Sequence, residues 1–381
     1  MDIAEKIDRN SWQPIKIDSI KLEELINIHK EVVIVDQYKN QLEELFLLRN
    51  PKFRFNKNYK NDLELFINEQ YVKDPIAAGN WFYYPWINAL IHFLPDELHQ
   101  EIRTGRNKYL ITEEEQETYY SAKIGILGMS VGSHIANTIA MTGGAKNIKL
   151  ADPDTISGDN LNRIRIGFQN VGVNKAIIVA RQIYEINPYA LVEIFKDGLS
   201  EANIESFLGD LNVLIEEMDN PFLKLRVREL AREKRIPVVM GTDNGDGVIV
   251  DIERYDINPN NQILNGLIGN LAAEELKQLS PKDLPRVAAR NAGANLAVPR
   301  MLESVPEVGR TIYSWPQLGT AANMCGTVVA YLARRIALRA SNIKSGRYQV
   351  NLDSIFESDY KRKWFSRKLG FFKFIKKMKN N

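Results

Sequence analysis

The chain has 381 residues, of which 44% are hydrophobic and 26% charged, a composition typical of a soluble protein with one large or two smaller domains. It contains no apolar run of about 18 residues, and its first residues lack the pattern of a secretory signal, so we expect no membrane span and a cytoplasmic location. The formal net charge is +2, and the single cysteine, Cys325, excludes an intramolecular disulfide and a four-cysteine zinc site, so no zinc is expected.

Residues 1–97 are expected to form an α/β N-terminal extension domain. A short strand is predicted at 31–36 (EVVIVD), and an amphipathic segment follows at 41–50 (QLEELFLLRN). The stretch 79–95 (GNWFYYPWINALIHFLP) is rich in aromatic side chains, which we expect to pack in a core or at a partner interface rather than to bind a ligand. No catalytic pattern is visible in this part of the chain.

Residues 98–345 are expected to form the main domain, in which strands and helices alternate from residue 121. Apolar strand segments are predicted at 122–128, 147–152, 191–197, 211–219 and 237–243. Amphipathic helices are predicted at 133–143, 174–187, 204–210, 221–235 and 319–340. This alternation predicts an α/β fold with a Rossmann-like, doubly wound and mainly parallel sheet. Such sheets bind ligands at the carboxyl ends of their strands.

The first strand of this domain leads into a glycine turn, in the segment KIGILGMSVGSHIA (123–136). The pattern G-x-S-x-G around Ser130 matches the turn that exposes a hydrolase serine, but the same turn also suits the phosphates of a nucleotide. A hydrolase of this kind needs an acid and then a histidine after the serine, and only His134 follows, four residues on. We therefore predict that Gly128, Ser130 and Gly132 let backbone amides approach phosphates.

An acidic residue at the end of the next strand agrees with a nucleotide site. Asp152 lies 24 residues after Gly128, where a carboxylate that binds ribose hydroxyls is expected. An NAD(P)-dependent oxidoreductase would show the same turn and the same acid, so these two features leave that class open.

Further motifs are more specific. The segment ADPDTISGDNLNRIRIGFQNVGVNKA (151–176) contains D-x-D, then N-L-x-R, then a lysine about a dozen residues later, and D-N and R-x-x-R motifs stand elsewhere in the chain. Together they resemble the ThiF-type, ubiquitin-activating-like (MoeB/ThiF) adenylyltransferase family. The residues that carry the resemblance are Arg103, Arg106, Asp152, Asp154, Asn160, Arg163, Lys175, Asp219 and Asn220.

The resemblance implies an ATP-dependent adenylyltransferase, in which a carboxylate attacks the α-phosphate of ATP and pyrophosphate leaves. It implies that Asp152 binds the ribose, with Asp154 and Asn160 as further ATP-binding residues. It also implies that Arg163 and Lys175 contact the phosphates. Taken singly, Arg163 and Lys175 would also fit surface residues.

Two more roles follow from the same resemblance. Asp219 is implied to bind Mg²⁺, although on its own it would also fit a helix cap. Arg106 is implied to reach into the partner subunit's site, which makes a homodimer the catalytic unit. The catalytic candidates are therefore Arg106, Arg163, Lys175 and Asp219.

The chain lacks the catalytic cysteine and the paired C-x-x-C motifs that many relatives have, and Cys325 is expected to be a packed side chain. We therefore expect a carboxylate to be activated and then attacked by an outside nucleophile. The expected substrate is the C-terminus of a ubiquitin-like or sulfur-carrier protein, or of a peptide. The alternatives are a cyclising enzyme like tRNA threonylcarbamoyladenosine dehydratase, an NAD(P)-dependent oxidoreductase, and a non-catalytic subunit that binds a partner.

The C-terminal segment 346–381 is expected to be a basic tail. Residues 361–381 carry nine Lys or Arg and no acid, mixed with aromatic side chains. This pattern suits binding to an anionic membrane surface or to RNA, or a plain solvated tail.

The resemblance implies that the polar segment 257–310 borders the acceptor carboxylate. The candidate residues for binding that carboxylate are Arg286, Arg290, Asn291 and Asn295.

Overall fold

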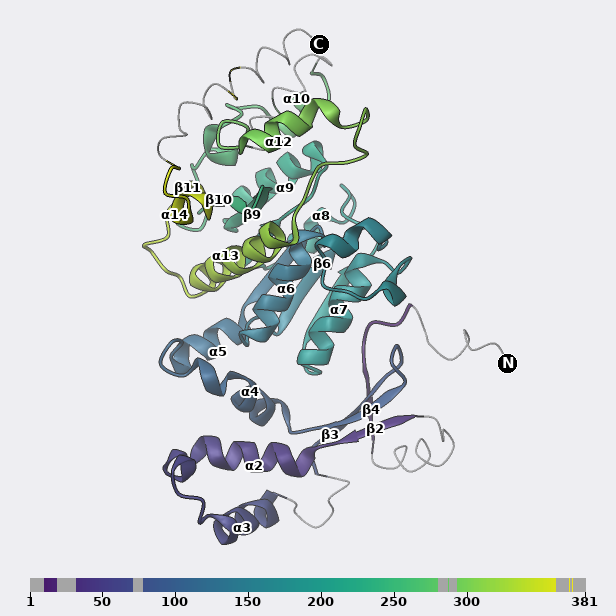
Figure 1. Ribbon diagram of the computed structural model, residues 1–381, viewed down its shortest axis with the longest axis vertical. Helices are drawn as coiled ribbons and strands as arrows, with labels where there is room; N and C mark the ends of the chain where they lie inside the picture. Colours follow the sequence, from purple (N-terminus) through teal and green to yellow (C-terminus); the bar gives the residue numbers. More distant parts are fainter. Residues whose placement is uncertain are drawn as a thin grey trace, which may run out of the picture.

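The computed structural model describes residues 10–18, 32–70, 78–279 and 293–360, and the single positions 287, 370 and 372. These residues form a four-stranded sheet in the N-terminal part of the chain and a seven-stranded sheet in the larger part (Figure 1). Within the described ranges, no helix combines the length and the apolar character that crossing a bilayer requires.

The large sheet is the centre of the fold. In spatial order its strands are β11 (Gly346–Val350), β10 (Gly247–Glu253), β9 (Val238–Asn244), β8 (Val213–Glu216), β5 (Lys123–Leu127), β6 (Asn147–Ala151) and β7 (Leu191–Phe195). The five strands from β9 to β7 run parallel to one another. Strand β10 runs antiparallel to both of its neighbours, β9 and β11. The predicted α/β, doubly wound and mainly parallel sheet is confirmed. The chain winds outward from β5 in both directions, which places the ligand crevice of such sheets at the carboxyl end of β5.

Helices cover both faces of this sheet (Figure 1). The helices α6 (Val131–Met141), α7 (Lys175–Ile186) and α13 (Gly319–Ala337) contribute to one apolar cluster, and α8 (Ile204–Leu208) and α9 (Pro221–Glu233) to another. Alternate residues of β8 divide between the two clusters, with Val213 and Ile215 in the first and Leu214 in the second. This explains why β8 begins as a continuous apolar run rather than an alternating one, because a strand covered on both faces has no solvent side.

Two asparagines define where helices begin beside the crevice. The side chain of Asn174 accepts hydrogen bonds from the N–H groups of Ala176 and Ile177 at the start of α7. Asn220 accepts one from Leu223 at the start of α9, where Pro221 occupies the first helical position. Asparagine caps and a proline in the first turn both favour helix initiation. The two asparagines therefore fix where α7 and α9 begin, at the edge of the sheet.

The N-terminal sheet has the order β1 (Ile15–Ile17), β3 (Asn80–Tyr84), β4 (Ala89–Phe93), β2 (Val33–Asp36). Its helical elements are α2 (Tyr38–Arg49), η2 (Pro51–Arg54), α3 (Lys60–Gln70) and α4 (Asp96–Thr104). The aromatic stretch 79–95 is the β3–β4 hairpin, and much of it packs against the main domain. Phe82, Tyr84, Trp86 and Phe93 belong to the same cluster as α6 and α7, which confirms the predicted core role of the aromatics.

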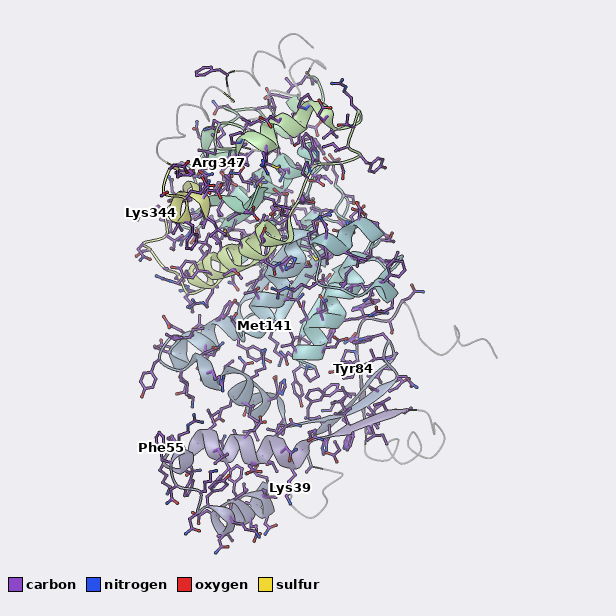
Figure 2. The ribbon with its side chains drawn as sticks, in the orientation of Figure 1. Lys39, Phe55, Tyr84, Met141, Lys344 and Arg347 are labelled. Atoms are coloured by element: carbon purple, nitrogen blue, oxygen red, sulfur yellow. The ribbon has the colours of Figure 1, made fainter. Side chains whose placement is uncertain are left out.

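Hydrogen bonds hold this hairpin to α7. The hydroxyl of Tyr84 donates to the Tyr184 carbonyl at 2.9 Å, and the indole of Trp86 donates to Glu185 at 2.7 Å. Figure 2 shows Tyr84 between the hairpin and the end of α7. Buried aromatic side chains with a satisfied polar end combine a large apolar contact with a directional bond, so this contact anchors the two sheets to each other.

His99 of α4 also joins the N-terminal region to α7, and it makes stability depend on pH. Its Nε2 donates to the Ile186 carbonyl at 3.1 Å, and burial lowers its pKa to about 4. Since the unfolded chain takes up this proton near pH 6.5, stability is present above that pH and is lost as the pH falls toward 4. We expect the free energy of unfolding to drop by about 2 kcal/mol more between pH 7 and pH 5 in the wild type than in His99→Gln, measured by urea titration. Equal pH dependence of the two proteins would contradict this assignment.

The remaining elements connect these layers. They are η3 (Gly105–Asn107), α5 (Glu113–Ser121), η4 (Gly158–Asn162), η5 (Phe168–Asn170), η6 (Ile263–Gly266), α10 (Ala273–Leu276), α12 (Pro299–Ser304), η7 (Val305–Glu307) and α14 (Asp353–Phe356). The strand β11 extends the large sheet into the segment assigned to the tail, and its Arg347 pairs with Asp251 of β10 at 2.8 Å (Figure 2). The basic residues of 361–381, with the predicted RNA or membrane contact, lie outside the described residues.

Candidate functional site

The glycine turn lies between β5 and α6, at the centre of the sheet. Gly128 has φ +85°, and a Cβ at this position would lie 2.5 Å from the carbonyl oxygen of Glu217, which follows β8. The Gly128 N–H donates to the Ala151 carbonyl at 2.8 Å. Gly132 lies against β5, where a Cβ would be 3.0 Å from Ile126. The turn therefore requires glycine at position 128, both for its backbone conformation and for the close approach of β8.

The carboxylate of Asp152 ties this turn to the end of β6. It accepts the Met129 N–H at 2.6 Å and the Asp154 N–H at 2.8 Å, one on each oxygen. Burial raises the pKa of Asp152, and the nearby charge of Lys175 opposes that effect. Each carboxylate oxygen has a second lone pair, so Asp152 retains acceptor capacity for the ribose hydroxyls that the sequence assigns to it.

Lys175 is the first residue of α7 and is buried rather than solvated. Its ammonium group pairs with the carboxylate of Asp154 at 2.8 Å, while Asp154 itself is largely exposed. The structure therefore brings Asp152, Asp154 and Lys175 together at the carboxyl end of β6.

Arg163 reaches the glycine turn from the end of η4. Its Nε donates to the hydroxyl of Ser130 at 3.2 Å, and its terminal nitrogen to the carbonyl of Asp159 at 3.1 Å and the side chain of Asn162 at 2.9 Å. The Nε2 of His134 donates to the Arg163 carbonyl, and burial lowers the pKa of that imidazole. Ser130 is thus paired with an arginine and not with a histidine, which agrees with the rejection of a hydrolase.

Asn160 is buried within the turn that presents Arg163. Its side-chain oxygen accepts the Ser157 N–H at 3.3 Å, and its amide donates to Asp159 at 3.3 Å. In this arrangement Asn160 shapes the loop, and its predicted contact with phosphate stays a prediction.

Asp219 lies after β8 and is exposed. The cap of α9 is its neighbour Asn220, so the helix-cap interpretation does not apply to Asp219. Asp219 makes no hydrogen bond or ion pair with any described residue, and the described part of the chain holds no group of three or more His, Cys, Asp or Glu suited to a metal. Mg²⁺ commonly takes only one or two protein carboxylates and completes its shell with water and phosphate oxygens, which is compatible with Asp219 acting alone.

Arg106 lies far from this cluster within one chain. It is exposed in η3, and the side chain of its neighbour Asn107 donates to the Thr142 carbonyl, just past the last residue of α6. Figure 2 shows that last residue, Met141, beside the α5 region. The 11 residues of α6 span about 16 Å between the glycine turn and this end. The structure therefore does not bring Arg106 to the other site residues, and its predicted reach into a partner's site stays a prediction.

A buried charge network that was not predicted from the sequence lies behind the site. Glu216, the last residue of β8, accepts from Lys224 at 2.8 Å, from Arg228, and from the Met218 N–H at 2.7 Å. Arg228 also donates to Glu253 at 2.7 Å. Burial alone would raise the pKa of Glu216, but Lys224 and Arg228 outweigh it and hold this pKa below its usual range. The network anchors the loop that carries Asp219, and two adjacent glutamates in the apolar strand VLIEEM were the available signal.

A second set of polar residues that was not predicted from the sequence lies on the β8–β9 side of the glycine turn. Asp243, near the end of β9, accepts from the amide of Gln317 at 3.3 Å, and burial raises its pKa to about 6. Glu217 accepts the Gly241 N–H at 2.8 Å. Cys325 of α13 is fully buried, and burial raises the pKa of its thiol well above the ordinary value. Cys325 is therefore a packed side chain, as predicted. Polar residues at the carboxyl ends of strands were the signal for Asp243 and Glu217.

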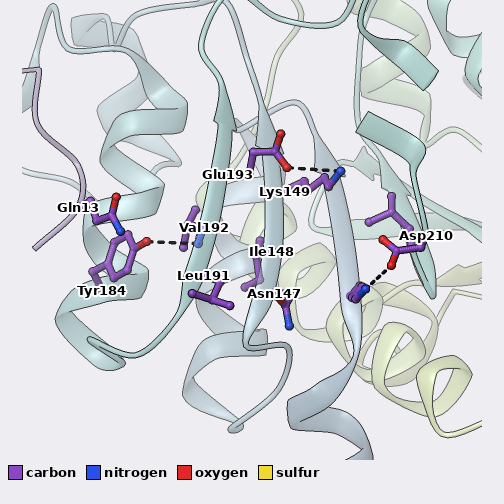
Figure 3. A pocket seen from close by; sticks show the side chains of 11 residues that line it. Gln13, Asn147, Ile148, Lys149, Tyr184, Leu191, Val192, Glu193 and Asp210 are labelled. Atoms are coloured by element: carbon purple, nitrogen blue, oxygen red, sulfur yellow. Dashed lines mark hydrogen bonds and ion pairs between the residues drawn. The ribbon is translucent and has the colours of Figure 1, made fainter. Parts of the chain in front are cut away.

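A cavity in the structure lies away from the glycine turn. A cavity of about 310 Å³ lies at the opposite end of the sheet, where β5, β6 and β7 begin (Figure 3). It is lined by ion pairs, Lys149 with Glu193 at 3.4 Å and Lys123 with Asp210. Ligands of such sheets bind at the carboxyl ends, so this cavity is not the candidate site. Among the acceptor candidates, Asn295 is exposed, and Arg286, Arg290 and Asn291 lie outside the described residues.

Large parts of this chain are similar to known proteins. Residues 105–366 match the model of the ThiF family. An uncharacterized protein of Mycobacterium tuberculosis (strain CDC 1551 / Oshkosh) is 37% identical over 281 residues, which are 74% of this chain and 39% of that protein. The tRNA threonylcarbamoyladenosine dehydratase of Escherichia coli (strain K12) is 31% identical over 153 residues, 39% of this chain and 56% of that enzyme. A probable molybdopterin-synthase adenylyltransferase of Porphyra purpurea is 32% identical over 123 residues, 31% of this chain and 32% of that protein.

In each of these relatives the matched part spans less than two thirds of the relative's own length. The family model, in contrast, covers more than half of this chain, including the glycine turn, Arg163, Lys175 and Asp219. The chain belongs to the ThiF family, whose adenylyltransferases use ATP.

Proposed function

We propose that this protein is an ATP-dependent adenylyltransferase that activates a carboxylate as an acyl adenylate, with release of pyrophosphate and without a cysteine of its own. The observation that carries the proposal is the convergence of Asp152, Arg163 and Lys175 around the glycine turn at the carboxyl end of β5. An oxidoreductase would account for the turn and Asp152, but it gives no role to Arg163 and Lys175.

The turn has the properties of a phosphate site. The first N–H groups of a helix have no intrahelical partners. At α6 the capping residue Ser130 makes no side-chain hydrogen bond to them, so these N–H groups can bind an anion. The helix dipole adds positive potential at the same end. Gly128 leaves no side chain between these amides and an approaching phosphate. An anionic triphosphate would satisfy the free N–H groups and meet Arg163 beside them.

The proposed reaction uses these groups to stabilise charge. The substrate carboxylate attacks the α-phosphorus while the bond to pyrophosphate breaks, and negative charge grows on the phosphoryl oxygens. Arg163 and Lys175 would neutralise that charge, with Lys175 exchanging its present pairing with Asp154 for a phosphate. Asp219 would hold Mg²⁺ through its exposed carboxylate, and the ion would add charge neutralisation at the leaving pyrophosphate.

For the substrate, we propose the C-terminus of a ubiquitin-like or sulfur-carrier protein, or of a peptide. The relative described as a molybdopterin-synthase adenylyltransferase supports this class. The second candidate is cyclisation of a carboxylate on a modified tRNA adenosine, which the dehydratase relative supports. We further propose a cytoplasmic location and a homodimer. The homodimer would account for Arg106, which is exposed at the far end of α6 and would reach a nucleotide site only in a second copy of the chain.

Calorimetric titration tests the nucleotide site. We expect the wild type to bind Mg·ATP saturably, Lys175→Ala to bind it at least about tenfold more weakly, and Asp219→Ala to lose the dependence of affinity on Mg²⁺. The control is Lys123→Ala, which removes an exposed ion pair at the opposite end of the sheet and should leave binding unchanged. Tight binding of NAD⁺ or NADH without any response to ATP would favour the oxidoreductase instead.

A further inference from the structure

The segment 50–60 (NPKFRFNKNYK) joins α2 to α3 at one end of the molecule (Figure 1). It contains four basic residues and no acidic one, and the nearest carboxylates along the chain are those of Glu44 and Asp62. All four cations are exposed, namely Lys52, Arg54, Lys57 and Lys60. None of them forms an ion pair with a described residue. The segment therefore presents positive charge that a polyanion can neutralise.

An aromatic ring stands among these charges. The side chain of Phe55 is 95% exposed, and it lies between Arg54 and Lys57 in the sequence. Figure 2 shows Phe55 and Lys39 at opposite ends of α2. A single exposed apolar residue is common on protein surfaces. An accessible ring together with four unpaired cations is more specific, because the group offers both a stacking face and phosphate-binding charges.

The packing beneath this ring fixes the backbone of the segment. Phe53 is buried, and its ring centroid lies 5.6 Å from that of Phe46 and 5.5 Å from that of Tyr59. The hydroxyl of Tyr59 donates to Glu43 of α2 at 3.3 Å. The side-chain amide of Asn50 donates to the Phe46 carbonyl at 2.9 Å, at the end of α2. The exposed groups are thus presented by an ordered turn, so that binding costs little backbone conformational entropy.

We propose that the segment 50–60 binds an unpaired stretch of RNA, with phosphates on its cations and one base stacked on Phe55. This surface lies outside the adenylation site, and the proposal does not depend on the adenylyltransferase function. Proteins bind single strands by combining a basic track along the backbone with aromatic side chains on which bases stack. RNA supplies such bases in its loops, bulges and ends, whereas duplex DNA keeps its bases stacked inside the helix.

An anionic membrane is the other polyanion that would suit cations beside an apolar ring. A bilayer is flat, so it would meet the beginning of α3 together with the segment. That part of α3 carries Asp62 and Glu64, which are both exposed and which anionic headgroups would repel. A single RNA strand is narrow and flexible enough to follow the segment alone. The charge pattern therefore favours RNA over a membrane.

Fluorescence anisotropy with the full chain tests the proposal. The probe is a fluorescein-labelled oligouridine of about ten nucleotides, a length within the range of single-strand sites. We expect micromolar affinity at low salt. Phe55→Ala should weaken it at least about fivefold, because the stacked base loses its platform, whereas Phe55→Tyr should stay within about twofold of the wild type. The matched control is Leu65→Ala on α3, which removes a side chain that is 64% exposed and should leave the affinity unchanged.

The salt dependence measures the phosphate contacts. Each phosphate that a single strand places on a cation contributes about −0.7 to the slope of log affinity against log salt concentration, so four cations contribute about −3. Lys57→Gln should therefore make the slope less negative by about 0.7. Lys39→Gln removes an exposed cation near the start of α2, at the other end of the same helix (Figure 2), and should leave the slope unchanged.

Photo-crosslinking locates the bound RNA, since the segment 361–381 is also basic. The oligonucleotide carries thiouridine, and mass spectrometry of the crosslinked chain should find Phe55 or its neighbours in the segment 50–60. Equal affinity of the wild type and Phe55→Ala, or crosslinks confined to other parts of the chain, would overturn the proposal. Binding to phosphatidylserine vesicles that Phe55→Ala abolishes, without any binding of RNA, would overturn it in favour of a membrane. Circular dichroism of each variant checks that the fold is retained.

Discussion

Replacing Gly128 by alanine should abolish Mg·ATP binding and lower the free energy of unfolding by about 3 kcal/mol or more. The new Cβ would lie 2.5 Å from the Glu217 carbonyl oxygen, a backbone atom that cannot rotate away, and φ at this position is +85°. The turn must then move away from β8, and the first N–H groups of α6 move with it. Calorimetry with Mg·ATP and urea unfolding followed by circular dichroism measure the two effects.

Gly269 provides the control for backbone strain. Its φ is +68°, and a Cβ there would have no heavy atom within 4 Å. Gly269→Ala should therefore cost only about 1 kcal/mol, the strain of placing an L-residue in the left-handed region, and should leave Mg·ATP binding intact. If Gly128→Ala and Gly269→Ala behaved alike, the close packing of the glycine turn against β8 would have no energetic role.

Replacing Arg228 by leucine should lower the free energy of unfolding by about 3–5 kcal/mol. Arg228 is fully buried and bridges Glu216 and Glu253, so its removal leaves Glu216 with Lys224 as its only cationic partner and Glu253 with none among the described residues. A buried carboxylate that loses its cation retains the whole cost of desolvation. Urea unfolding at pH 7 measures this effect.

Arg226→Leu, on the same helix, is the matched control. Arg226 is half-buried and pairs with Glu229 at 3.1 Å, three residues along α9. A helix pair that solvent still reaches contributes only about 0.3–0.5 kcal/mol, so the two arginine substitutions should differ several-fold in their effect on the free energy of unfolding. Similar losses in both variants would show that the buried network around Arg228 contributes no more than the Arg226–Glu229 pair.

The fold was predicted from the sequence where it depends on residues that are neighbours along the chain. The alternation of apolar strands and amphipathic helices predicted the doubly wound sheet, since each strand of such a sheet is covered on both faces. Gly128 and Asp152 were predicted as site residues because a tight turn and an acid at the end of the next strand recur at short, regular spacing. Lys175 was predicted from the resemblance to the ThiF-type family, and the structure adds that it is buried against Asp154.

The order of residues along the chain determined which elements form and which motif residues stand at strand ends, because both depend on local periodicity and turn chemistry. The tertiary structure decided which distant groups meet. Arg163 contacts Ser130, and Asp243 contacts Gln317 across 74 positions, only because the sheet brings their loops to one edge. Burial, which raises the pKa of Asp243 and leaves one of its oxygens without a donor, arises from the packing of α13 over β9. No local pattern encodes that packing, since it depends on residues far apart in the chain excluding water together.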